Sequence, residues 1–117
     1  MAYTTIKKST SYFNTVLYTG NASTRSITGV GFQPDMVWTK SRGNSNNHNI
    51  YDAVRGATKR VYPNSTTGEA TTSNTLTSFD SDGFSLGDQD NVNANGITMA
   101  SWSWNCLLYT SPSPRDQ

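Results

Sequence analysis

The stretch ITMASWSWN, residues 97–105, decides the fold that we predict for this chain. Successive side chains of a β-strand point to opposite faces. Ala100, Trp102 and Trp104 therefore share one face, whereas Met99 and two serines share the other. This alternation predicts a strand with one heavy, apolar face.

Seven further segments rich in β-branched and aromatic residues precede this strand. Turn signals built from Gly, Pro, Asn and Asp separate them, and no long window shows helical periodicity. We predict strands at residues 15–19, 23–28, 36–41, 49–54, 58–62, 75–79, 83–86 and 97–105. Eight short strands separated by turns predict an all-β fold, a two-layer antiparallel β-sandwich or jelly roll.

The composition supports a folded, β-rich domain. The 117 residues are 33% hydrophobic and only 15% charged, because 15 Ser, 17 Thr and 12 Asn make up much of the chain. Disordered chains combine low hydrophobicity with high net charge, whereas this chain has a net charge of +1. That charge gives no basis for nucleic-acid binding, and no window approaches the roughly 18 apolar residues of a membrane span.

The three tryptophans and the single histidine are the candidate ligand-binding residues: Trp38, His48, Trp102 and Trp104. We favour burial of the tryptophans in the core, because a buried aromatic side chain removes roughly 150–250 Å² from water. The alternative is an exposed platform on which sugar rings stack, with nearby polar groups as hydrogen-bonding partners. For the histidine we expect a loop position and one hydrogen bond.

The stretch FDSDGFSLGDQDNVNANG, residues 79–96, is an alternative candidate for a calcium site. Calcium takes oxygen ligands at alternate positions, and the candidate ligands are Asp80, Asp82, Asp88 and Asp90. The bidentate Glu of a calcium loop is missing, so we favour two turns in which Asp and Asn bond their own backbone. We therefore expect no metal and no cofactor.

The remaining groups of polar residues indicate structural roles rather than catalysis. Asp52 and Arg55 lie three residues apart at the end of a predicted strand, and we expect a structural ion pair there rather than a ligand site. No nucleophile motif is present, and no pair of carboxylates can be assigned to sugar hydrolysis. We therefore expect no enzymatic activity.

The last twelve residues, CLLYTSPSPRDQ, residues 106–117, change abruptly in character. Their first eleven residues match the conceptual translation of a transposase-type sequencing adapter, so we expect a non-native, disordered tail. A genuine flexible terminus is the alternative. The expected β-sandwich module is residues 1–105, which contains no cysteine and would continue into a longer natural protein.

Five segments carry a resemblance to a known family: YFNTVLYTGNAS, SITGVGFQPDMVWTKSR, IYDAVRGATKR, LTSFDSDGFSLG and ITMASWSWN. They resemble an uncharacterised β-rich module that recurs in bacteriophage tail-fibre-like and other virion-associated proteins. The resemblance covers residues 1–105 and implies a lectin-like jelly-roll sandwich located in the virion. That module has no established catalytic residues, so the resemblance transfers no site.

The resemblance implies a non-enzymatic module for attachment to the host surface, with carbohydrate binding as its mode. The alternative is a purely structural domain for virion assembly or decoration. The implied partners are other virion proteins and a host-surface glycan, with a homo-oligomer expected for the full-length protein. Neither nucleic acid nor membrane insertion is expected.

Overall fold

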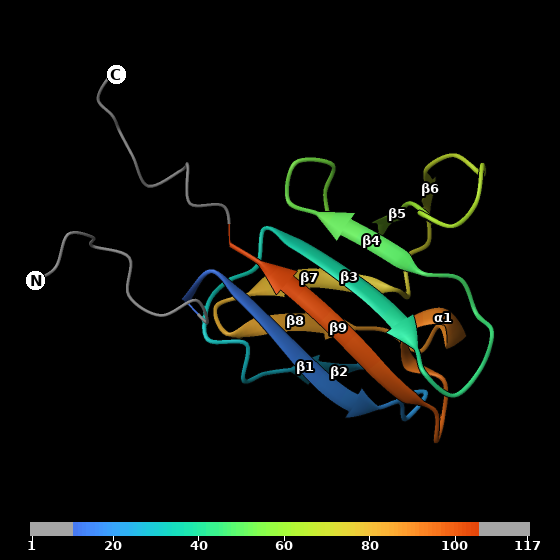
Figure 1. Ribbon diagram of the computed structural model, residues 1–117, viewed down its shortest axis with the longest axis horizontal. Helices are drawn as coiled ribbons and strands as arrows, with labels where there is room; N and C mark the ends of the chain where they lie inside the picture. The colour runs from blue at the N-terminus through green and yellow to red at the C-terminus, as the bar shows by residue number, and fades with distance from the viewer. Residues whose placement is uncertain (1–10, 106–117) are drawn as a thin grey trace, which may run out of the picture.

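The computed structural model describes residues 11–105, and antiparallel β-strands dominate it (Figure 1). The strands are β1 (Phe13–Thr19), β2 (Arg25–Ile27), β3 (Met36–Ser41), β4 (Asn49–Asp52), β5 (Lys59–Arg60), β6 (Ala70–Thr71), β7 (Leu76–Asp80), β8 (Gly83–Leu86) and β9 (Thr98–Trp104). A four-residue helix, α1 (Asp90–Asn93), precedes β9. The predicted all-β, antiparallel class is therefore confirmed.

Two sheets form the body of the domain. One has the strand order β1-β9-β3-β4 and the other the order β2-β8-β7. In Figure 1 the three-stranded sheet lies behind the four-stranded one. A small third sheet, β5-β6, joins the edge strand β4 through a bridge between Ile50 and Val61. Strand β9 pairs with β1 on one side and with β3 on the other, so it lies inside the larger sheet.

Each of the eight predicted segments contains a strand, but two elements were not predicted. The paired residues Ala70–Thr71 are too few to show alternation. The second turn expected within residues 79–96 contains α1, whose first turn is capped by Gln89: its side chain accepts the backbone N–H of Asn91 at 2.6 Å. A helix of one turn has no repeat for a periodicity argument to detect.

The hydrophobic core joins the two main sheets. Its buried residues come from both sheets, from the loop after β2 and from α1: Ile27, Val30, Phe32, Val37, Tyr51, Leu76, Phe84, Leu86 and Val92. Full burial of one such side chain stabilises the fold by roughly 1.5–3 kcal/mol. These contacts fix which side of the four-stranded sheet points inward.

The tryptophans lie on the opposite side of that sheet, so the prediction that they enter the core is wrong. In β9 the side chains of Ser101 and Ser103 are buried, whereas Trp102 and Trp104 are only half-buried. The facing sheet already fills the interior with large side chains such as Phe84, and a close-packed interior leaves room for small residues opposite them. The hydroxyl of Ser101 donates to the backbone of β1, which offsets the cost of burying it.

Within residues 11–105 no helix has the length and apolar character needed to cross a membrane. The adapter-like tail at residues 106–117 lies outside the described residues. So do residues 1–10 at the start of the expected module.

Candidate functional site

The outer face of the four-stranded sheet carries a hollow of about 260 Å³ lined by Trp38, His48, Trp102 and Trp104. We call it the tryptophan hollow. Strand β3 supplies Trp38, β9 supplies Trp102 and Trp104, and His48 directly precedes β4. The structure thus brings together, from three separate segments, all four residues that the sequence named as ligand-binding candidates.

Strand register explains why these rings meet. Trp38 lies directly opposite Trp102 in the pairing of β3 with β9, and residues in such positions have their Cβ atoms roughly 4.5–5.5 Å apart. Phe13 lies opposite Trp104 in the pairing of β1 with β9. The ring centroids of Phe13 and Trp104 are 5.1 Å apart, and their planes are inclined at 49°. Aromatic side chains therefore extend across three neighbouring strands.

His48 is held against Trp38 by a side-chain hydrogen bond. The indole N–H of Trp38 donates to Nδ1 of His48 at 2.9 Å, and the two rings meet edge to face with centroids 5.8 Å apart. Because Nδ1 accepts this bond, the neutral imidazole carries its proton on Nε2. The backbone N–H of His48 donates to Oδ1 of Asn64 at 3.2 Å. His48 thus lies in a loop, as expected, and makes two hydrogen bonds where one was expected.

The size and walls of the tryptophan hollow limit what it can hold. Pockets for drug-sized ligands enclose roughly 300–1,000 Å³, so a hollow of about 260 Å³ suits a group the size of one ring. Beside it, Phe13 and Leu17 of β1 remain 37% and 59% exposed. Leu17 lies opposite Ala100 and thus on the same face. Phe13 and Leu17 therefore extend the apolar surface beyond the hollow.

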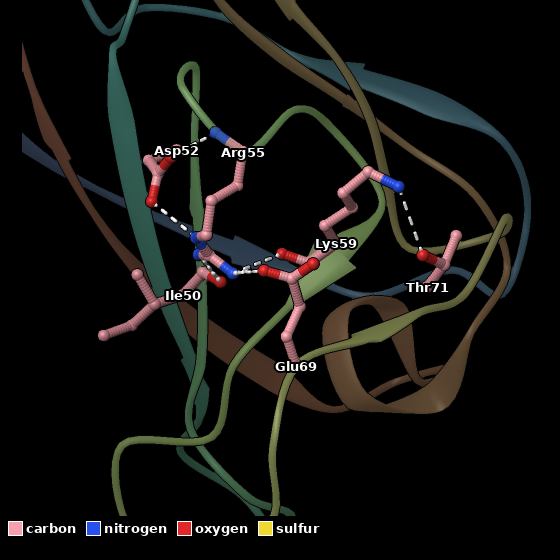
Figure 2. A network of polar contacts seen from close by, with 6 residues as sticks. All are labelled: Ile50, Asp52, Arg55, Lys59, Glu69 and Thr71. Atoms are coloured by element: carbon pink, nitrogen blue, oxygen red, sulfur yellow. Dashed lines mark hydrogen bonds and ion pairs between the residues drawn. The ribbon is translucent and has the colours of Figure 1, made fainter.

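The predicted ion pair between Asp52 and Arg55 is present, and its role is structural (Figure 2). Nε of Arg55 lies 2.8 Å from Oδ2 of Asp52, and the guanidinium also reaches the carbonyls of Ile50 and Lys59 and the carboxylate of Glu69. Burial of the Asp52 carboxyl would raise its pKa, but hydrogen bonds from the Arg55 backbone and side chain lower that pKa overall. Arg55 thus ties the end of β4 to β5 and to the segment before β6.

The structure does not gather the aspartates of the alternative calcium site. They fall on the β7–β8 hairpin, on the loop leading into α1 and on the first residue of α1: Asp80, Asp82, Asp88 and Asp90. The Asp82 carboxylate accepts the backbone N–H groups of Gly29 and Gly31 at 3.0 and 2.7 Å, which lower its pKa. In the described part of the chain, no group of three or more His, Cys, Asp or Glu side chains is placed to hold a metal ion.

Sequence reasoning missed two further side chains on the outer face, Phe13 and Leu17. The predicted first strand began at residue 15, whereas β1 begins at Phe13. The alternation in FNTVLYT was the available signal, because it places Phe13, Thr15 and Leu17 on one face and Val16 and its neighbours on the other.

The family model for a domain of unknown function, DUF7483, matches residues 8–111 of the chain. A search of curated proteins and a search of solved structures each gave no significant match. The family description names no activity, so a functional conclusion depends on the site itself.

Proposed function

We propose that this chain, which belongs to the DUF7483 family of domains of unknown function, is a non-enzymatic module that binds carbohydrate. The observation that carries the proposal is the convergence of Trp38, Trp102, Trp104 and His48 around one hollow on an outer sheet face. The C–H face of a sugar ring is apolar and flat, so it packs against an aromatic ring, while its hydroxyls require hydrogen-bonding partners.

The tryptophan hollow offers the apolar contact, and the residues around it carry hydrogen-bond donors. Within residues 11–105, the half-buried indoles of Trp102 and Trp104 make no side-chain hydrogen bond, so their N–H groups can donate to a ligand. Nε2–H of His48 is a third donor, since Nδ1 is occupied by Trp38. Aromatic faces combined with a few donors are typical of a small-ligand site.

Binding without hydrolysis is supported by the residues around the hollow. Glycosidases use two Asp or Glu side chains roughly 5–9.5 Å apart, whereas the hollow is lined by three tryptophans and a histidine. Because the chain resembles tail-fibre-like modules, we propose that it is part of the virion. There it would attach the virion to a glycan on the host surface. The same resemblance leads us to propose lectin-like jelly-roll connectivity for the two antiparallel sheets, and a homo-oligomer in the full-length protein.

A glycan array probed with the full chain, followed by titration calorimetry on each hit, tests carbohydrate binding. Trp102→Ala should abolish binding, because it removes one wall of the hollow. The matched control is Thr77→Ala, which alters an exposed residue of β7 in the other sheet and should bind as wild type does. An array without hits, or equal affinities for the wild type and Trp102→Ala, would refute the proposal.

A second function, structural packing within the virion, is favoured by the apolar surface beyond the hollow. Leu17 is 59% exposed on β1 and lies beside the aromatic row rather than in the hollow. A neighbouring virion protein or a second copy of the chain could cover it. Leu17→Gln, which removes the apolar group without adding charge, should then prevent incorporation into virions while leaving glycan binding unchanged. Virions that incorporate this variant normally would contradict the packing role.

A further inference from the structure

We infer that the tryptophan hollow selects a negatively charged sugar, of the class that carries a ring carboxylate, and that Lys40 recognises its charge. This inference rests on the proposed carbohydrate binding and names the class of sugar. It arises from the polar and charged groups that share the outer face with the three tryptophans.

Two charged side chains lie on this face, one on β3 and one on β4. Lys40 is half-buried and alternates with the buried residues Thr39 and Ser41, so it points outward with Trp38. Asp52 of β4 is neutralised by Arg55 at 2.8 Å. Lys40, by contrast, forms no ion pair within residues 11–105. The face therefore carries an uncompensated positive charge next to the tryptophans.

Lys40 does not line the hollow, but the strand register places it on the same face and close to the tryptophans. It lies two residues from Trp38 on the same face, a distance of roughly 6.6 Å along the strand. It lies opposite Ala100 and hence diagonal to Trp102, and such diagonal neighbours are roughly 7–8 Å apart, within reach of long side chains.

Hydrogen bonds hold the Lys40 ammonium near the end of β3. Nζ donates to the carbonyl of Ser41 at 2.5 Å and to that of Asn44 at 3.1 Å. An ammonium has three N–H donors, so one remains for a ligand. A carboxylate that accepts it would form a charge-assisted hydrogen bond, which is roughly twice as strong as one between neutral groups.

The walls of the hollow are almost wholly apolar, so it holds the flat face of a ring and leaves the ring's polar substituents to groups outside it. The indole N–H of Trp38 is used by His48, whereas those of Trp102 and Trp104 form no hydrogen bond within residues 11–105. A ligand rich in acceptor oxygens satisfies donors of this kind. Aromatic faces alone would also attract a quaternary ammonium ion, but the Lys40 charge opposes any cation bound beside it. The combination of stacking faces, donors and one ammonium fits an acidic sugar.

Titration calorimetry with the full chain tests the inference with three probes: glucuronic acid, glucose and choline. The wild type should bind the acid about tenfold more tightly than the neutral sugar, and choline not at all. Lys40→Met keeps most of the aliphatic stem but removes the charge, so its affinity for the acid should fall about tenfold, to that for glucose. Lys40→Arg keeps the charge and should retain the preference. Lys59→Met removes a lysine that instead contacts Thr71, and should behave as wild type.

The outcomes separate this inference from the proposed function. Equal affinity for the acid and for glucose, or a preference that survives in Lys40→Met, would overturn the acidic-sugar inference and leave carbohydrate binding intact. Binding of choline in preference to both sugars would overturn it as well. If the folded wild type, checked by near-ultraviolet circular dichroism, bound no probe and no sugar on the glycan array, both the inference and the proposed function would fall.

Discussion

Asn93 should be among the most sensitive polar positions of this fold. It lies in α1, is fully buried, and makes side-chain hydrogen bonds with two other segments. Its Oδ1 accepts the backbone N–H of Asn21 at 3.0 Å, and its Nδ2 donates to the carbonyls of Ser23 at 2.7 Å and Gly87 at 2.9 Å. This one side chain therefore connects the loop after β1, the end of β8 and the helix.

The expected cost of Asn93→Ala follows from these contacts. A fourth, longer bond joins Nδ2 to Oδ1 of Asn21 at 3.3 Å. Each of the three shorter hydrogen bonds contributes about 1 kcal/mol net, and each partner left buried without a bond adds a desolvation cost. We expect the free energy of unfolding to fall by about 3–4 kcal/mol, a large fraction of the roughly 5–15 kcal/mol typical of a domain. Asn93→Asp should be at least as harmful, because a carboxylate oxygen would replace the amide donor and face two carbonyls.

Urea unfolding followed by tryptophan fluorescence measures this change, with the slope of the transition as a check on two-state behaviour. The control is Asn95→Ala, an exposed site two residues away, which should change the free energy by no more than about 0.5 kcal/mol. A loss below about 1 kcal/mol for Asn93→Ala, or full tolerance of Asn93→Asp at neutral pH, would refute the reasoning.

Three further predictions concern other parts of the fold. Arg55→Lys keeps the charge but loses the planar fork that reaches four acceptors, so urea unfolding should show a loss of about 1–2 kcal/mol. Backbone N–H groups lower the pKa of Asp82, so the unfolded chain takes up this proton at higher pH than the folded chain. Stability should therefore fall as the pH drops below 3.8 and through the lowered pKa, and the fall should be smaller in melting curves of Asp82→Asn. Phe84→Ala should cost about 3–5 kcal/mol in urea unfolding, and Trp102→Ala distinctly less, because Trp102 lies outside the core. If the two substitutions lowered the free energy of unfolding equally, Trp102 would have to be assigned to the core.

The sequence alone was sufficient for the class of the fold and for much of its strand pattern. Alternation of side chains and closely spaced turn residues are local properties, and they located β3 and β8 with the observed bounds. The same alternation correctly separated the two faces of β9. It also placed Trp102 and Trp104 together on one face, whereas Trp38 and His48 were named only for their residue types.

Only the tertiary structure decided which face of β9 enters the core. Hydrophobicity favoured the tryptophan face, but that choice depends on the volume that the opposing sheet leaves free, and Phe84 and Leu86 come from segments distant in the sequence. The register that sets Trp38 opposite Trp102, and His48 beside them, likewise depends on pairing between remote strands. Local patterns determine how side chains are divided between faces, whereas packing between layers determines which of those faces remains open to a ligand.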